Sequence, residues 1–414
     1  MRRFTTITGA LLVLAGCADS DNSVVGPGAS PLPTARNVTS ETSSDLWASI
    51  ITGETGPGSL YQLYMPRQWN GATVFYAHGI RDVLEPVSLR DQDGSQALRD
   101  QLGALGYAIG NSSFSENGYA VEDAARRMHQ LRGLFASRFG QPERSFLLGH
   151  SLGSLAIMQL AEQFPDQYDG VVPICGIAGG TRAQLEYVVN VRALFDVFYP
   201  GLLPGTPNAP VPGYVIDAAK QQQIIGAVLA NPAGMLLIAS TAETPLEFTT
   251  VPQMLESLLA ALSYHARGAD NVLSFTNGKF PVANAGVTYS PRSNLPTPLL
   301  PPAVLAGLLG IANAQVARFD ADSSAAVWAD NHFTPSGALQ IPTMTLHNRW
   351  DRLVPFFHEG MFAQRVVDAG ATNLLVQRAN PAWGYGHCII PNSAIVQAVT
   401  DLNTWVETGI KPAN

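Results

Sequence analysis

The chain has 414 residues, of which 46% are hydrophobic and 14% charged, and its formal net charge is −8. So high an apolar fraction with so few charges excludes a chain that is disordered throughout. The excess of acidic residues, without a cluster of lysine and arginine, argues against nucleic acid as a partner. A chain of this length can bury a large core, so it needs no metal or disulfide lattice to fold.

The N-terminal residues are predicted to be a targeting signal. An apolar stretch follows two arginines and is too short to span a bilayer permanently. Residues 14–17 read Leu-Ala-Gly-Cys, which resembles the signal of bacterial lipoproteins. That resemblance implies a signal peptide over 1–17, a lipid on Cys17 and, because Ala18 is not Asp, an anchor in the outer membrane. The alternative is ordinary cleavage near Ala18 and secretion.

Residues 18–45 are expected to form a flexible linker. They are rich in Ser, Thr, Pro and Gly and show no apolar periodicity. No later stretch reaches the 18 or so unbroken apolar residues that a membrane-spanning helix needs, so we expect none beyond the signal.

From residue 46 onward, apolar runs and amphipathic stretches alternate along the chain. The alternation at 59–65 suits an edge strand. Compact apolar runs are typical of buried strands, and 3.6-residue periodicity is typical of helices. Further strands are predicted at 72–77, 106–110, 144–148 and 170–175, and helices at 94–105, 121–139 and 152–164. This order predicts a largely parallel sheet with helices on both faces.

Residues 177–340 interrupt the alternation. The segment is rich in proline, which disfavours further parallel sheet. Its predicted helices lie near 183–198, 214–230, 252–266 and 301–317. Strands are predicted again at 341–347 and 373–378, with helices at 357–368 and 391–408. We therefore expect one α/β core, 46–176 and 341–414, with a mainly helical insertion over 177–340.

The most informative motif lies at 149–153, which read Gly-His-Ser-Leu-Gly. The motif falls where a predicted buried strand ends and a helix begins, the context that a G-x-S-x-G nucleophile requires. Glycines on both sides of the serine allow the backbone to make a tight turn that exposes the hydroxyl. The motif predicts Ser151 as a nucleophile.

A serine nucleophile needs a histidine base and an acid that orients the histidine. Of eight histidines, His387 lies in a glycine-rich loop after the last predicted strand and is favoured; His347 is the next candidate. Asp351 follows the penultimate strand, so the order is Ser, Asp, His. The alternative makes Asp351 a turn residue paired with Arg349 or Arg352. Weaker candidates for the acid are Asp330, Glu359 and Asp368.

With these residues the chain resembles the serine esterases and lipases of the α/β-hydrolase superfamily. The resemblance implies an α/β-hydrolase fold and ester hydrolysis through an acyl-enzyme. It also implies an oxyanion hole made by the backbone N–H groups of Leu152 and, in the His-Gly-Ile sequence at 78–80, of Ile80. The insertion is placed to act as a lid, and its apolar helices suit an apolar or aromatic acyl group.

The cysteine after the predicted base allows a second comparison. Tannases and feruloyl esterases are similar in carrying a cysteine directly after the catalytic histidine, bonded to one directly before the serine. Here position 150 is histidine, and Cys175 ends the neighbouring strand. We therefore predict a Cys175–Cys388 disulfide; the alternative is two buried free thiols.

No dinucleotide, phosphate-loop or metal-binding motif is evident, so no cofactor or metal is expected. The predicted partners are a small-molecule ester and, if Cys17 is acylated, a membrane. Three other functions remain open for the same residues: an amidase or peptidase, an acyltransferase, and a surface binding protein without catalysis.

Overall fold

The computed structural model describes residues 38–89, 95–295 and 297–413. The predicted signal peptide over 1–17, the lipidation of Cys17 and residues 18–37 of the predicted linker lie outside the described residues.

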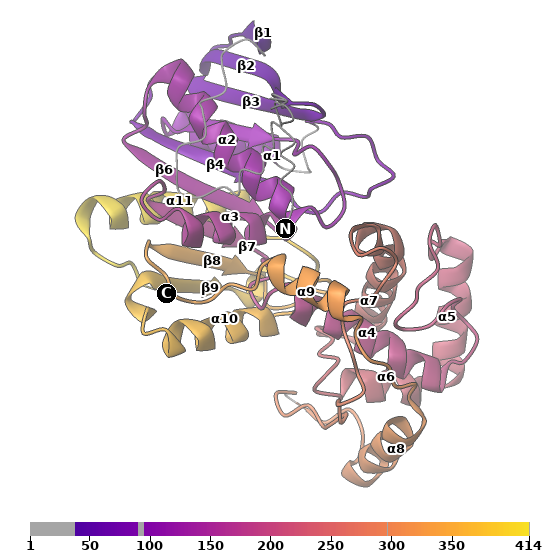
Figure 1. The fold of residues 1–414 in the computed structure, drawn as a ribbon. Coiled ribbons are helices and arrows are strands. Elements are labelled where there is room, and N and C mark those ends of the chain that lie inside the picture. Colours follow the sequence, from indigo (N-terminus) through magenta and orange to yellow (C-terminus); the bar gives the residue numbers. More distant parts are fainter. Residues whose placement is uncertain (1–37, 90–94, 296, 414) are drawn as a thin grey trace, which may run out of the picture. The chain divides into compact units, whose positions relative to one another are not determined.

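The described residues form one nine-stranded sheet in the order β1-β2-β3-β5-β4-β6-β7-β8-β9 (Figure 1). The first four strands in this order pair antiparallel, and all pairs from β5–β4 to β8–β9 are parallel. The strands are β1 (Val38–Thr42), β2 (Trp47–Gly56), β3 (Ser59–Pro66), β4 (Ala72–Ala77), β5 (Ala108–Ser112), β6 (Arg144–His150), β7 (Gly170–Ile174), β8 (Thr343–His347) and β9 (Leu375–Ala379).

Helices cover both faces of this sheet, which explains why its central strands are apolar throughout. On one face, α2 (Val121–Phe139) and α3 (Leu152–Gln163) pack on Phe75, Leu147 and Val171. On the other, α1 (Ser95–Ala104) and α11 (Asn392–Thr408) pack on alternate residues of the same strands. The remaining core helix is α10 (Phe357–Asp368), and short 3₁₀ turns span Thr372–Leu374 and Pro381–Trp383. This architecture is the α/β-hydrolase fold, as predicted.

Two predictions for the N-terminal part of the sheet are wrong. β3 is not an edge strand, because β2 and then β1 lie outside it. Residues 38–42 are not linker, because they form β1 and pair with β2. The side chains of β1 are nearly all exposed, and an edge strand is held by backbone hydrogen bonds, so its sequence carries no apolar pattern.

The segment between β7 and β8 is helical and has its own apolar core, built from helices α4 to α8 and the loops that join them. Its helices are α4 (Thr181–Phe198), α5 (Ala218–Ala230), α6 (Pro232–Ala239), α7 (Val251–Asn271), α8 (Pro302–Gln315) and α9 (Ser323–Asn331), with a 3₁₀ turn at Leu273–Phe275. Helices α6 and α9 were not predicted. Most apolar residues of the segment therefore stabilise the segment itself.

Within the described ranges, no single helix is both long and apolar enough to cross a bilayer. Only the pair α5 and α6 passes that test together, and the two are bent by 94° at the break between them.

Two helical glycines test the packing directly. In α1, a Cβ on Gly103 would lie 2.2 Å from the buried indole ring of Trp47, whereas Gly226 in α5 has no neighbour within 4 Å of its Cβ position. We expect Gly103→Ala to lower the free energy of unfolding by about 1–3 kcal/mol through overpacking. The matched control Gly226→Ala should raise it by about 0.5–1 kcal/mol through helix propensity. Urea unfolding measures both; changes of the same sign would contradict the packing.

Candidate active site

Ser151 occupies a strained turn between β6 and α3. Its backbone angles are φ 51° and ψ −120°, a region that non-glycine residues rarely adopt. A Cβ on Gly153 would lie 2.4 Å from the carbonyl oxygen of Ala77, and one on Gly149 would lie 2.6 Å from that of Gly153. Both neighbours are backbone atoms that cannot move aside, so the two glycines allow the turn to form.

Hydrogen bonds hold this turn against β7. The Ser151 N–H donates to Ile174 O at 2.9 Å. The Ser154 hydroxyl donates to Ser151 O at 2.5 Å and accepts from the Ile177 N–H at 3.2 Å. These bonds offset the strain and fix the position of the Ser151 side chain.

The structure brings Ser151, Asp351 and His387 together from three loops. His387 Nε2 lies 3.0 Å from Ser151 Oγ. On the other side of the ring, His387 Nδ1 lies 2.8 Å from Asp351 Oδ2 and 3.0 Å from Oδ1. Since a carboxylate only accepts, Nδ1 carries the hydrogen and Nε2 is free to accept the hydrogen of the serine hydroxyl.

Asp351 is completely buried and receives three sets of hydrogen bonds. Besides His387, the N–H groups of Leu353 and Val354 donate to its Oδ1, each at 2.9 Å. Burial alone would raise the pKa of Asp351, but the neighbouring His387 and His347 and the Val354 N–H outweigh it. The pKa of Asp351 therefore lies below its ordinary value, and the carboxylate is ionised at neutral pH.

The alternative reading of Asp351 as a partner of a nearby arginine does not hold. Arg349 lies 3.3 Å from Glu247, and Arg352 lies 3.6 Å from Glu256. Both acidic partners belong to the insertion, so these arginines connect the loop of Asp351 to the helical segment.

His347, the second candidate for the base, is bound elsewhere. Its Nε2 lies 2.9 Å from Val354 O, and its Nδ1 lies 3.3 Å from Glu359 Oε1. The ring is fully buried behind Asp351, with 3.8 Å between His347 Nε2 and Asp351 Oδ2. His347 therefore supports the loop of Asp351.

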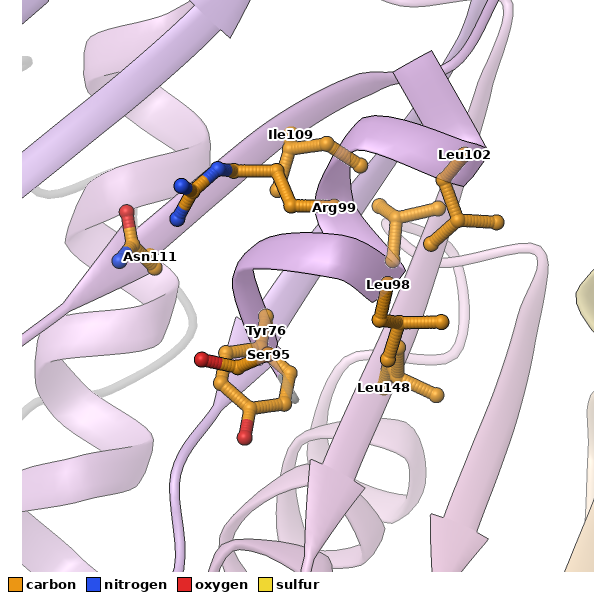
Figure 2. Close-up of a pocket in the computed structure, with 9 residues that line it drawn as sticks. Tyr76, Ser95, Leu98, Arg99, Leu102, Ile109, Asn111 and Leu148 are labelled. Atoms are coloured by element: carbon orange, nitrogen blue, oxygen red, sulfur yellow. The ribbon is translucent and has the colours of Figure 1, made fainter. Parts of the chain in front are cut away.

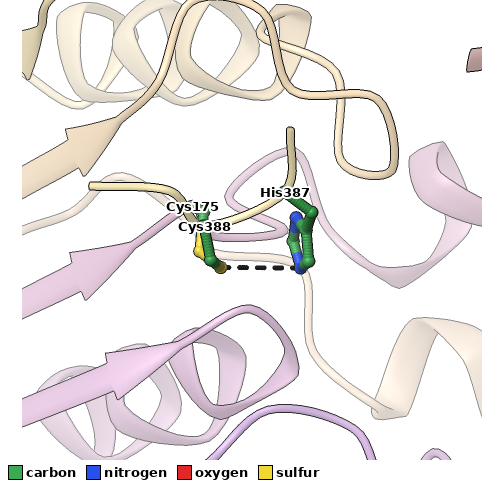
Figure 3. A group of neighbouring side chains, drawn as sticks. All are labelled: Cys175, His387 and Cys388. Carbon is green, nitrogen blue, oxygen red and sulfur yellow. Dashed lines mark hydrogen bonds between the residues drawn. A yellow bond between two sulfur atoms is a disulfide. The ribbon is translucent and has the colours of Figure 1, made fainter. Parts of the chain in front are cut away.

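Cys175 and Cys388 form a disulfide with their Cα atoms 5.3 Å apart (Figure 3). The bridge joins the end of β7 to the loop of His387, and Cys388 Sγ lies 3.5 Å from His387 Nε2. These two sulfurs and the imidazole lie within 4.8 Å of one another, as metal ligands can. Metal binding requires thiolates, however, and these sulfurs are bonded to each other. The group therefore restrains the loop of His387.

A second set of contacts ties the loops of the acid and base to each other. Asn348 Nδ2 donates to Gly386 O at 2.6 Å, and the Gly386 N–H donates to Trp350 O at 3.1 Å. The Tyr385 hydroxyl, two residues before His387, donates to Gln253 O of α7 at 2.8 Å. Side-chain and backbone hydrogen bonds thus hold the loops of Asp351 and His387 together.

Helix α7 of the insertion contacts the loops of His387 and Asp351 and the loop after β4. Near its start it bonds Tyr385 and pairs Glu256 with Arg352. Near its end it reaches the loop after β4, where Arg267 pairs with Asp82 and Asn271 Oδ1 accepts from the Val83 N–H at 3.1 Å. One rigid helix therefore sets the spacing of three loops that come from different strands.

A cavity of about 610 Å³ lies beside His387, large enough for a small organic molecule. Residues of α7 supply much of its wall, with Leu353 from the loop of the acid and Ile80 from the loop after β4. Leu152, the other predicted oxyanion donor, is the first residue of α3, where a backbone N–H has no acceptor within the helix. Their assignment as oxyanion donors stays a prediction.

The buried hydroxyl of Tyr264 has no hydrogen-bond partner among the described residues, and Tyr264 lines this cavity.

A second cavity, between α1 and the sheet, measures about 20 Å³ and has room for one water molecule (Figure 2). Of these two cavities, the one beside His387 is therefore the better candidate for a substrate site. No sequence pattern singled out Tyr264 or Tyr385, although Tyr385 lies in the glycine-rich loop two residues before His387.

No family model matches the chain. A curated protein from Aspergillus flavus named "Probable feruloyl esterase B-2" is 27% identical over 143 residues, which cover 32% of this chain and 26% of that protein. The aligned part thus spans about a quarter of that relative's length. Two solved structures are similar in fold. Feruloyl esterase B from Aspergillus oryzae is 14% identical, with a TM-score of 0.47 and coverage of 91% of this chain and 88% of that chain. Lipase A from Candida antarctica is 12% identical, with a TM-score of 0.45 and coverage of 91% and 83%.

The disulfide gives a direct test of how this site is held. We expect replacement of Cys175 and Cys388 by serine to lower the free energy of unfolding by about 2–5 kcal/mol. The two single variants and the double variant should unfold at the same urea concentration, because loss of one cysteine is enough to remove the disulfide. With a reductant present, the urea midpoint of the wild-type protein should fall toward that of the variants. If neither the substitutions nor the reductant changed this midpoint, the disulfide would be contradicted.

Proposed function

We propose that the protein hydrolyses carboxylic esters through an acyl-enzyme, with Ser151 as nucleophile, His387 as base and Asp351 as the acid that orients it. The proposal is carried by one observation, the continuous hydrogen-bond chain from Asp351 through His387 to Ser151 Oγ, with distances of 2.8 and 3.0 Å. Its geometry fits proton transfer from the hydroxyl, because the histidine has only one nitrogen free to accept.

In the first half of the reaction, Ser151 Oγ attacks the ester carbonyl while His387 Nε2 takes the hydroxyl proton. The imidazolium that forms is stabilised by the buried carboxylate of Asp351. Negative charge develops on the carbonyl oxygen, and the N–H groups of Leu152 and Ile80 are its proposed donors. His387 then gives its proton to the leaving alcohol, and an ester of Ser151 remains.

In the second half, water takes the place of the alcohol. His387 accepts a proton from the water, which attacks the acyl-enzyme, and then returns a proton to Ser151 as the acid leaves. Ile80, Leu259 and Leu353 line part of the cavity beside His387, and that part suits an apolar or aromatic acyl group. Much of the rest of the wall is polar and includes the charged residues Asp82, Glu256, Arg267 and Arg352. From the relative named as a feruloyl esterase we carry over only the class of ester hydrolase.

We further propose that the protein is exported and that Cys17 carries a lipid that anchors it in the outer membrane. This rests on the sequence Leu-Ala-Gly-Cys at 14–17 after an apolar stretch. A disulfide in the structure suits an oxidising compartment and is compatible with export.

Replacement of the nucleophile tests the proposed reaction. We expect Ser151→Ala to lower kcat for a p-nitrophenyl ester by at least about 10⁴-fold, because no other group can form the acyl-enzyme. The control Ser137→Ala changes an exposed serine of α2 and should leave turnover unchanged. Near wild-type turnover by a folded Ser151→Ala protein would contradict the proposal. Matched esters and amides then distinguish an esterase from an amidase.

A further inference from the structure

A buried pair of charged residues lies behind the proposed acid and has no part in the reaction described above. His347 is the last residue of β8, and Glu359 lies in the first turn of α10. His347 has no exposed surface, and Glu359 is only 4% exposed. Burying two ionisable groups is unfavourable unless they are paired and hydrogen-bonded, so their contacts decide their protonation states.

Each ring nitrogen of His347 faces an oxygen atom that can accept a hydrogen bond. Nε2 faces the carbonyl oxygen of Val354 at 2.9 Å, and a carbonyl oxygen only accepts. Nδ1 faces Glu359 Oε1 at 3.3 Å. The other oxygen of that carboxyl, Oε2, already accepts from Thr345 Oγ1 at 2.5 Å and Gln377 Nε2 at 2.6 Å. With Oε2 occupied by two donors, Oε1 is the oxygen left to accept from His347 Nδ1, an arrangement that suits an imidazolium.

The other titratable groups near the ring agree with this state. Burial alone would lower the pKa of His347, but Glu359 and Asp351 outweigh it and hold the pKa above its ordinary value. His358, the third neighbour, is neutral. Its Nδ1 accepts from the Gly179 N–H at 3.0 Å and its Nε2 donates to Gln184 Oε1 at 2.8 Å. Burial lowers the pKa of His358 far below its ordinary value.

We propose that His347, held as an imidazolium by Glu359, is a positioning residue for Asp351. Its Nε2–H holds the carbonyl of Val354, whose own N–H bonds Asp351, so one side chain fixes the turn that presents the acid. Its charge also balances that of Glu359 directly behind Asp351. The consequence for catalysis rests on the proposed function, whereas the protonation state does not.

The proposal makes an electrostatic prediction that differs between two variants. His347→Gln keeps an amide donor but leaves Glu359 as an unbalanced buried anion near Asp351. The extra negative charge favours the protonated form of His387, so the acid limb of the kcat/KM profile should move upward by about one pH unit. His347→Gln/Glu359→Gln removes both charges, so its acid limb should return to within about 0.3 pH units of wild type.

Profiles of kcat/KM against pH, measured for wild type and these variants with a p-nitrophenyl ester, test this prediction. If His347 had only a structural role, its replacement would lower kcat without moving the acid limb of the kcat/KM profile. The double variant would then have a lower kcat than His347→Gln. An unmoved limb in His347→Gln, or a limb that stays displaced in the double variant, would overturn the proposal.

Neutron diffraction from deuterated wild-type crystals at about pH 8 tests the protonation state without any variant or activity. We expect deuterium on both Nδ1 and Nε2 of His347 and none on Glu359. Deuterium on Glu359 with a bare Nδ1 on His347 would overturn the proposal. If Ser151→Ala stayed active, the proposed function would be wrong, but deuterium on both nitrogens of His347 could still be observed. Failure of the proposed function and failure of the proposal for His347 can therefore be distinguished.

Discussion

The strained turn at Ser151 is the constraint on which the rest of the site depends. A positive φ at a non-glycine residue costs of the order of 1–3 kcal/mol, so the surrounding structure must enforce it. Here the carbonyls of β4 pass so close to α3 that only glycine fits at position 153, and the Ser151 N–H is bound to the end of β7. Relaxing the turn would break these contacts. The same geometry leaves the serine hydroxyl and the first N–H groups of α3 at the edge of the sheet.

Loops are the least ordered parts of most folds. A hydrogen-bond chain of three side chains nevertheless requires that each side chain be placed accurately. In this protein the loop of His387 is held by a disulfide, by Asn348 and by α7. The loop of Asp351 is held by the His347–Glu359 pair and by the arginines that reach the insertion. The insertion therefore contributes to this arrangement, since α7 contacts the loops that carry Asp351 and His387.

The sequence predicts the elements whose side chains carry a strong pattern. Residues 121–139 and 357–368 have clear amphipathic periodicity, and the structure has helices with these bounds. The tight turn at 149–153 was predictable because glycines flank Ser151 at fixed positions between a predicted strand and a predicted helix. β1 was missed because an exposed edge strand is held through its backbone. The short helix α6 was missed because it is apolar on all sides, with no periodicity to detect.

The role of His347 shows a different limit. It resembles a catalytic histidine in sequence, since it ends a late strand as a base could. Its actual partners, Val354 and Glu359, lie 7 and 12 residues further along and face it only after the turn and α10 have folded. The pairing of Arg349 and Arg352 with the insertion is equally invisible, because those contacts join segments about 100 residues apart.

The central claim is that Ser151 is a reactive nucleophile activated by His387. The most direct measurement is reaction of the folded protein with a fluorophosphonate, followed by mass spectrometry of its peptides. We predict a single phosphonyl group on Ser151, formed at a rate that falls as His387 becomes protonated. A phosphonyl group on a different residue, or no reaction by folded protein, would contradict it.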